Sequence, residues 1–539
     1  MKPGPWIVYA ALAAGPLCGQ LSYERILQAE SEPQHWLTYS GSYRSWRYSR
    51  LDQINRQNVA GLKVAWVFQM PLSERIETTP LVADGVMYAT MPPASVIALD
   101  PATGRPFWRY RRSLPDKINV CCGQVNRGVA VLGDRVFLGT VDAHLVALNA
   151  KTGAVLWDVE VADSRTGHSI TGAPLVVKDM VITGIAGGEY GIRGFLDAYD
   201  ARTGKRRWRL WTIPGPGENG NETWGGDSWK QGGGPTWLTG SYDAEQNLII
   251  WGVGNPSPDW NGDVRPGDNL YSDSAIAVDA DTGKLKWHFQ FVPHDVHDWD
   301  AVQVPVLVDS EWRGQPRKLV YWAHRGGFYY VLDRETGQFL HGKPFATQTW
   351  AKGLDDSGRP IRNPGVDPTE AGVYVWPGVQ GATNWYSPSY NPLTDLFYLT
   401  VWENKGLYRK GDVEYVPGNR YIGSVPQIDL EDEPGYGAIR ALNPKTGDRV
   451  WEYKLHTKPW SGVLSTAGKL VFGGSGGWIT RERQELEGYF YALDAETGKE
   501  LWRINLGGDM SASAMTYQVK GKQIVVMPAG GGLFAFALP

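Results

Sequence analysis

The stretch Ala98-Leu99-Asp100-Pro101-Ala102-Thr103-Gly104 is followed by Trp108, four residues after its glycine. An apolar run leads into the aspartate, Thr-Gly supplies a tight turn, and the tryptophan sits on the next apolar run. The chain of 539 residues carries six further copies of this pattern, and all but the one at Gly337 keep the tryptophan; their turn glycines are Gly153, Gly204, Gly283, Gly337, Gly447 and Gly498. A unit that repeats in this way predicts a fold built by stacking.

Each repeat reads as four short strands. In the first copy, Pro80–Val82 and Val86–Ala89 flank an Asp84-Gly85 turn and precede the strand-turn-strand phrase itself. Four antiparallel strands per repeat are typical of a propeller blade. We expect the tryptophans to pack between adjacent blades.

Two intervals between repeats are long. The step from Asp200 to Asp279 spans 79 residues and the step from Asp333 to Asn443 spans 110, whereas the others span about 50. Stretches rich in Gly, Pro and Trp at 211–234 and roughly 341–380 indicate ordered insertions. The longer interval contains one complete strand set, and a ninth blade within it is the alternative.

The two ends of the chain complete an eighth blade. Strands are expected at 513–516, 524–527 and 533–536, and the missing fourth is 62–68, near the start. Such closure leaves no free sheet edge. The sequence therefore predicts an all-β, eight-bladed propeller with tryptophan-docking repeats, whose single domain spans residues 21–539.

Composition narrows the function classes. The chain is 42% apolar with a net charge of −4 and no basic run, which argues against a nucleic-acid partner. Met1-Lys2 and the apolar stretch 6–14 predict a signal peptide over residues 1–20, too short to serve as a transmembrane anchor. We expect export to the periplasm, with a lipid-attached Cys18 as the lesser alternative.

Cys121 and Cys122 are adjacent, and no C-x-x-C-H haem motif occurs, so the chain is expected to bind no c-type haem itself. Neighbouring Cα atoms lie about 3.8 Å apart, whereas disulfides usually bridge about 5.5 Å. Two buried thiols and a strained disulfide therefore both remain open from spacing alone.

The blades together with the motif C-C-x-x-V-N-R-G at 121–128 resemble the quinoprotein alcohol dehydrogenases, which include methanol and ethanol dehydrogenases. Members of that family are eight-bladed periplasmic propellers that use pyrroloquinoline quinone (PQQ), and the resemblance covers essentially the whole mature chain. It implies a Cys121–Cys122 disulfide against one face of the quinone and Trp237 against the other. An indole is well suited to hold a flat aromatic cofactor.

The resemblance also assigns groups around the cofactor and its metal. Arg325 resembles the cation beside the reactive quinone oxygens. The other expected cofactor-binding residues are Glu77, Arg127, Thr171, Ala186 (in place of a frequent serine), Gly187, Gly188, Asn384, Trp385 and Trp460. The expected metal ligands are Glu189, Asn255, Asp298 and Asp300.

Asp298 and Asp300 lie in the cluster Pro293-His294-Asp295-Val296-His297-Asp298-Trp299-Asp300. The resemblance makes Asp298 the catalytic base, with His297 in place of the usual tryptophan. Asp300 would add a third carboxylate to one ion, and extra negative charge favours a trivalent cation. Lanthanide-dependent members carry an aspartate at this place, so we expect one lanthanide(III) ion, with Ca²⁺ as the alternative.

The resemblance implies oxidation of primary alcohols to aldehydes, with electrons leaving to a separate, soluble c-type cytochrome. Arg325 is expected to assist Asp298 in catalysis. A homodimer is a further possibility. Two other classes stay open at this point: a quinoprotein dehydrogenase for sugars or polymeric alcohols, and a non-enzymatic propeller scaffold.

Overall fold

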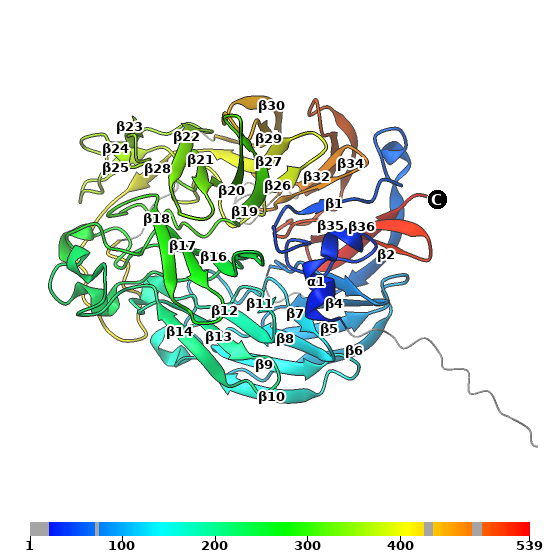
Figure 1. The fold of residues 1–539 in the computed structure, drawn as a ribbon, viewed down its shortest axis with the longest axis horizontal. Helices are drawn as coiled ribbons and strands as arrows, with labels where there is room; N and C mark the ends of the chain where they lie inside the picture. Colours follow the sequence, from blue (N-terminus) through cyan, green and yellow to red (C-terminus); the bar gives the residue numbers. More distant parts are fainter. Residues whose placement is uncertain (1–20, 71–74, 425–434, 477–487) are drawn as a thin grey trace, which may run out of the picture.

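Eight blades, each with four antiparallel strands, stand around a common centre in a computed structural model, and a fifth, parallel strand joins one of them (Figure 1). The model describes residues 21–70, 75–424, 435–476 and 488–539. The predicted signal peptide, residues 1–20, lies outside the described residues. The eight-bladed propeller expected from the repeats is confirmed.

The strands follow the repeats along the chain. Blades one to three are β3 to β14, at Leu81–Ala83, Val86–Met91, Ser95–Leu99, Pro106–Arg111, Ala130–Leu132, Arg135–Gly139, His144–Asn149, Val155–Glu160, Leu175–Val177, Met180–Gly184, Phe195–Asp200 and Arg206–Trp211. Blades four and five are β15 to β22, at Ser241–Asp243, Leu248–Val253, Ser274–Asp279, Leu285–Gln290, Val306–Trp312, Gln315–Ala323, Phe328–Asp333 and Phe339–Pro344. Blade six comprises β26, β27, β29 and β30, at Ser389–Asn391, Leu396–Glu403, Tyr436–Leu442 and Arg449–Lys454.

Blade seven comprises β31 to β34, and the short β1 pairs with it in parallel; these strands are Val463–Thr466, Leu470–Gly474, Tyr489–Asp494, Glu500–Asn505 and Tyr48–Ser49. Blade eight comprises β35 to β37 and β2, at Met515–Val519, Lys522–Ala529, Gly532–Ala537 and Lys63–Gln69. The helical elements are short: α1 (Tyr23–Leu27) and the 3-10 turns Ala29–Ser31, Val59–Gly61, Ser164–Thr166, Gly188–Tyr190, Asn221–Thr223, Ser228–Gln231 and Gly262–Val264.

Position within a blade explains the apolar pattern. The third strand of blade one, β5, is buried along its whole length, because neighbouring blades cover both of its faces. The outermost strand, β6, alternates between exposed and half-buried residues, as expected of a strand with one face in solvent.

The tryptophans lock adjacent blades together. Trp208 of blade three donates its indole N–H to the Ala280 carbonyl of blade four, over 2.9 Å. It also covers Gly283, where a Cβ would stand 2.6 Å from the indole. The same pair of contacts joins Trp66 to Gly104, Trp108 to Gly153, Trp157 to Gly204, Trp287 to Gly337 and Trp451 to Gly498. The predicted packing between blades is confirmed for five of the repeat tryptophans, and Trp66 of the closing strand β2 makes the same contact.

The repeat without a tryptophan uses a different contact. Tyr329 of blade five donates its hydroxyl to the Pro444 carbonyl of blade six over 3.0 Å. Its ring and the Lys343 side chain cover Gly447 instead of an indole. A tyrosine on the third strand thus replaces the missing outer-strand tryptophan.

Ring closure uses both chain ends, as predicted. β2 pairs antiparallel with β37, from Lys63 opposite Ala537 to Gln69 opposite Gly532. Figure 1 shows the blue β2 beside the red C-terminal strands.

The long interval holds one blade and two insertions. The first, 345–388, contains the hairpin β23 (Ala351–Leu354) and β24 (Pro360–Arg362) and the strand β25 (Val373–Val375). The second, 404–435, lies between β27 and β29, and its strand β28 (Gly406–Tyr408) pairs with β25. Within the described residues no ninth four-stranded sheet exists.

Residues 36–49, here called the floor segment, cross the centre of the ring. The segment hydrogen-bonds the first strands of blades one, three, four, five, six and seven; these contacts are Trp36–Val82, Tyr43–Val176, Tyr43–Tyr242, Arg44–Leu307, Trp46–Tyr390 and Arg47–Ser465. It therefore ties together blades that are far apart in sequence.

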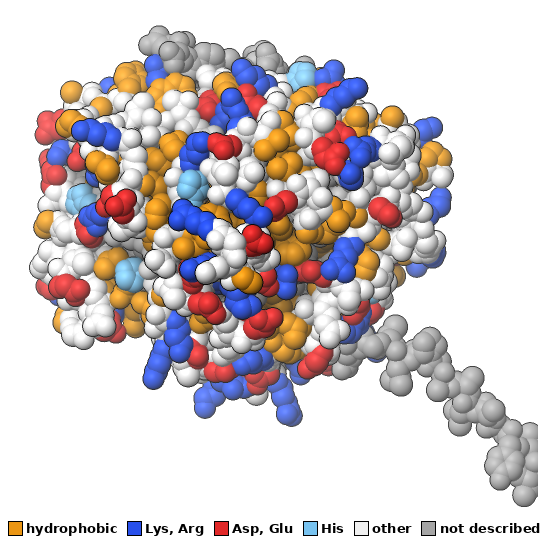
Figure 2. All heavy atoms as spheres, turned by 45° about the horizontal axis from the view of Figure 1, so that its top comes forward, with side chains coloured by type: hydrophobic (Ala, Val, Ile, Leu, Met, Phe, Trp, Pro, Cys, Tyr) orange, Lys and Arg blue, Asp and Glu red, His pale blue; other side chains and the backbone are white. Residues whose placement is uncertain are grey.

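Acidic and basic side chains are interspersed on the face shown in Figure 2. Among the described residues, no helix has the length and apolar character needed to cross a membrane.

Candidate functional site

A cavity of about 520 Å³ is formed by loops from most blades and from the second insertion. All but two of the predicted site residues line it: Glu77, Cys121, Cys122, Arg127, Thr171, Ala186, Gly187, Glu189, Trp237, Asp298, Asp300, Arg325, Asn384, Trp385 and Trp460. Gly188 and Asn255 lie directly behind this wall. Residues spread over almost 400 positions of sequence are thus brought together at one site.

One wall carries the two cysteines. Cys121 and Cys122 are joined by a disulfide with an S–S distance of 2.11 Å, which selects the disulfide over the two free thiols that spacing left open. Trp237 lines the same cavity from the loop before β15.

A buried arginine offers hydrogen-bond donors to the cavity. Arg127 forms an ion pair with Glu77 over 2.7 Å, and its guanidinium lies 4.8 Å from the Trp237 ring centroid and 4.7 Å from that of Trp385. Its Nε and Nη1 atoms are buried and have no hydrogen-bond partner in the described part of the chain. Buried donors without partners are costly, so this wall suits a flat, anionic ligand.

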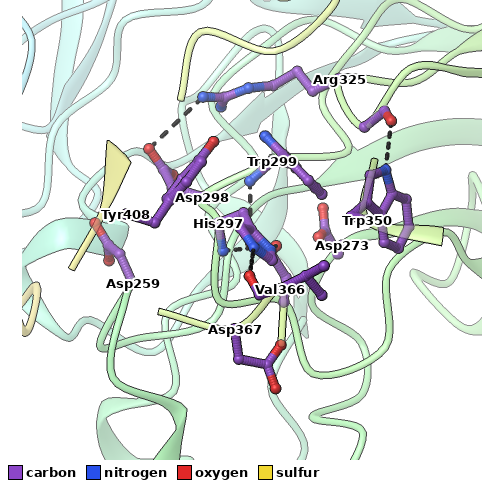
Figure 3. Close-up of polar contacts among 12 residues, drawn as sticks. Asp259, Asp273, His297, Asp298, Trp299, Arg325, Trp350, Val366, Asp367 and Tyr408 are labelled. Carbon is purple, nitrogen blue, oxygen red and sulfur yellow. Dashed lines mark hydrogen bonds and ion pairs between the residues drawn. The ribbon is translucent and has the colours of Figure 1, made fainter. Parts of the chain in front are cut away.

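Asp298 and Asp300 lie beside Arg325 in the lining of the cavity. Arg325 Nη1 donates to Asp300 Oδ2 over 2.5 Å. Its Nη2 lies 3.7 Å from Asp298 Oδ2, as Figure 3 shows. Asp298 Oδ1 is buried and has no hydrogen-bond partner within the described residues. An acceptor of this kind fits a proton donor or a cation.

Burial raises the pKa values of the acids at this site. Loss of hydration is the largest cause for both Glu189 and Asp298, and it raises the pKa of Glu189 to about 7 and that of Asp298 well above its usual range. Asp300 raises both further by charge repulsion, whereas Arg325 opposes this effect. A cation would favour the ionised forms.

Asn255 is held in place by hydrogen bonds from its side-chain amide and its backbone N–H. Its Nδ2 donates to Asp259 Oδ1 over 2.9 Å, and its backbone N–H donates to Asp300 Oδ1 over 2.9 Å. The opposite atom, Oδ1, would stand 2.7 Å from a Cβ at Gly188. Only glycine fits there without displacing the oxygen, and the next residue is Glu189.

The acidic oxygens are not gathered into a single tight cluster. Glu189 Oε1 lies 4.0 Å from Cys122 Sγ, and Asp300 is engaged by Arg325. Among the described residues, the only three side chains of ligand type with atoms all within 4.8 Å of one another are Cys121, Cys122 and Glu189. Disulfide sulfurs are unsuited to a hard cation, which prefers oxygen ligands. A metal ion in this cavity would therefore bind to the carboxylate and amide oxygens.

His297 fills a packing position. Its ring stacks on Trp299 at 4.3 Å, meets Tyr408 edge-on, and contacts the Val366 carbonyl through Nε2 over 2.9 Å (Figure 3). Burial lowers the pKa of His297 to about 3, so the ring is neutral. It orients the loop that carries Asp298.

Several residues that line the cavity belong to no sequence motif and were not predicted from the sequence. Arg75 donates to the Cys122 carbonyl over 2.6 Å and Arg420 to the Cys121 carbonyl over 2.8 Å. Trp260 and Ile422 line the cavity and share a backbone hydrogen bond. Two of these residues come from the second insertion, which has no counterpart in the repeat.

The ring and its site define a class: propeller enzymes whose central cavity suits a flat, anionic cofactor and is lined by several carboxylates. The family model described as PQQ, glucose/ethanol/alcohol dehydrogenase, beta-propeller domain, matches residues 36–343 and 405–525. The chain belongs to this family of PQQ-dependent oxidoreductases, and the resemblance seen in the sequence is confirmed.

Individual relatives span the chain. Quinoprotein alcohol dehydrogenase PedH of Pseudomonas putida is 40% identical over 553 residues, covering 98% of this chain and 91% of that protein. Quinoprotein ethanol dehydrogenase of Pseudomonas aeruginosa is 35% identical over 568 residues, covering 96% and 89%. The solved structure of a europium-containing methanol dehydrogenase superposes with a TM-score of 0.88 at 33% identity, covering 96% of this chain and 100% of that one.

Proposed function

We propose that this enzyme oxidises primary alcohols to aldehydes with PQQ and one metal ion, and passes the electrons to a separate c-type cytochrome. The observation that carries the proposal is the joint placement of the disulfide, Trp237, Arg127 and Asp298 around one cavity. Family membership argues against the non-enzymatic scaffold.

The residues present suit both groups. Arg127 would hold the cofactor through the donors that lack partners, and the disulfide and Trp237 would face its two sides. Glu189, Asn255, Asp298 and Asp300 would supply oxygen ligands to the metal. When bound, PQQ supplies a two-electron acceptor, and the metal supplies Lewis acidity.

The protein's own groups would move the proton and hold the charge. Asp298 takes the proton of the substrate hydroxyl through Oδ1, the buried oxygen that has no hydrogen-bond partner among the described residues. Arg325, 3.7 Å from the other oxygen of this carboxylate, stabilises negative charge that develops on oxygen nearby.

We propose a lanthanide(III) ion over Ca²⁺. Three carboxylates, those of Glu189, Asp298 and Asp300, line one cavity and carry more negative charge than a divalent ion balances. Arg325 already neutralises part of the charge of Asp300, so the ion must share this carboxylate with the arginine.

Location and assembly complete the proposal. Residues 1–20 are proposed to direct export to the periplasm, and residues 21–539 to act as one propeller domain. The electron acceptor is proposed to be a soluble c-type cytochrome, in keeping with the lack of a C-x-x-C-H motif in the 539 residues. A homodimer stays a prediction.

A panel of substrates tests the proposal. Protein reconstituted with PQQ and either La³⁺ or Ca²⁺ should reduce an artificial electron acceptor with primary alcohols. The rate of acceptor reduction should be lower with glucose or polyvinyl alcohol. Faster reaction with sugars or polymers would assign it to the alternative dehydrogenase class, and no reaction with any donor would contradict the proposal.

A further inference from the structure

Arg47, in the floor segment, is a fully buried cation. None of its surface is exposed to solvent. Its guanidinium donates to Thr79 Oγ1 over 2.7 Å and to the Tyr39 and Ala514 carbonyls, each over 3.2 Å. It also lies 5.7 Å from the Trp36 ring centroid and 5.5 Å from that of Tyr39.

In the described part of the chain, Arg47 forms no ion pair with a carboxylate. Within the described residues, every hydrogen-bond acceptor of Arg47 is neutral, and its Nε has no partner. Burial lowers the pKa of Arg47 to about 10, so the side chain stays charged at neutral pH. Burying an uncompensated charge is costly, which makes its presence in the interior informative.

Two other buried arginines show the usual arrangement. Arg440 pairs with Glu403 over 2.7 Å and with Glu452 over 2.6 Å. Arg265, also fully buried, interacts electrostatically with Asp259 and Asp295. Arg47 differs from both because its surroundings supply no anion.

Two neighbours of Arg47 connect it to the part of the cavity wall that carries Arg127. Thr79, which accepts from Arg47, donates its backbone N–H to the Arg127 carbonyl over 2.9 Å. Tyr39, stacked on Arg47, packs with Trp385 and Trp460 of the cavity lining. The charges of Arg47, Arg127 and Glu77 all act on the Tyr39 hydroxyl. Arg127 and Glu77 offset each other, and Arg47 leaves a net positive charge.

We propose that Arg47 is an electrostatic positioning residue whose missing counter-ion is the anionic cofactor bound above it. It makes no contact with the cavity itself. Its charge acts through the floor, and the bound carboxylates in turn offset the cost of burying the guanidinium. The inference rests on the proposed function, because it takes PQQ as the anion.

The test is the affinity for PQQ, measured by quenching of tryptophan fluorescence at a fixed metal concentration. Arg47→Met removes the charge and should weaken binding about tenfold, the effect of one charge acting over roughly 10 Å of protein. Arg47→Lys keeps the charge and should bind more tightly than Arg47→Met. Arg440→Met, which removes a buried arginine that does not line the cavity, should bind as the wild type does.

The rise in Tm on adding PQQ is a second measurement, and it does not depend on catalytic activity. The rise in Tm should be smaller for Arg47→Met than for the wild type, because the bound anion no longer balances a buried cation. Arg47→Gln is the neutral variant of choice if Arg47→Met does not fold, since its amide can still donate to Thr79 and Tyr39.

Three outcomes of these measurements would contradict the proposal. A folded neutral variant that binds PQQ as tightly as the wild type overturns the proposal. Failure of both neutral variants to fold, while Arg440→Met folds, also contradicts it, because the role of Arg47 would then be structural. A wild-type protein that binds no PQQ overturns the proposed function itself, and this inference with it.

Discussion

Asp298 combines a rare backbone conformation with a side chain suited to proton transfer. Its φ of 59° is left-handed, a conformation that non-glycine residues adopt mainly as Asp or Asn. Asp298→Asn should therefore fold normally, bind PQQ, and lose about 10²- to 10⁴-fold in kcat as the general base is removed. The exposed Asp263, which pairs with Lys410, offers Asp263→Asn as the control. Turnover near that of the wild type would refute the role of Asp298.

Asp300 is the residue on which the choice of metal depends. Asp300→Ala removes one carboxylate. It also removes the acceptor of the hydrogen bond that Arg325 Nη1 donates. We expect activity with La³⁺ to be lost, because a trivalent ion depends most on the third negative charge. Steady-state rates with La³⁺ and with Ca²⁺ measure this, and equal La³⁺-supported rates in variant and wild type would exclude the assignment.

Glu189 should make metal binding depend on pH. Burial raises the pKa of Glu189 to about 7, and the raised folded-state value means that its stabilising effect on the metal-free fold is present at low pH and lost as pH rises through 7. A cation needs the ionised form, so affinity for Tb³⁺ should increase between about pH 6 and about pH 8. Terbium luminescence sensitised by tryptophan measures it. Glu189→Gln should make the profile less steep, because the pKa of Asp298 is raised as well, and an affinity that falls with pH would contradict this interpretation.

Blades are joined by indoles that cover turn glycines. Gly283 and Gly85 are both left-handed, with φ of +70° and +81°, but a Cβ would meet Trp208 at 2.6 Å only at Gly283. Gly85→Ala should cost about 1–2 kcal/mol of stability for its backbone alone, and Gly283→Ala about 1–3 kcal/mol more for the overpacked indole. Calorimetric Tm values at one scan rate compare the two. Equal losses would show that the indole contact contributes nothing.

At the scale of elements, the repeat made the blades predictable because one glycine and one tryptophan recur at fixed spacing. The second insertion, 404–435, was not foreseen because it has no periodicity, and Arg420 was therefore missed together with it. Spacing also could not decide the pairing of Cys121 and Cys122, which family resemblance implied. Tyr329 shows the limit of the motif, since another side chain on a neighbouring strand can make the same blade contact.

In the whole molecule the site lies where the blades converge, and the floor segment packs against the inner strands of the ring. The segment hydrogen-bonds the first strands of six blades, and β2 closes the ring with β37. Most predicted site residues meet in one cavity because their loops all follow strands of this ring. Sequence motifs identified these residues, but only the ring fixes their mutual arrangement.

Anomalous diffraction from crystals of the protein reconstituted with PQQ and La³⁺ tests the central claim most directly. The account predicts one lanthanum peak in the cavity beside Glu189 and Asp298, with PQQ between the Cys121–Cys122 disulfide and Trp237. A lanthanum peak elsewhere, or a quinone bound outside this cavity, would contradict it.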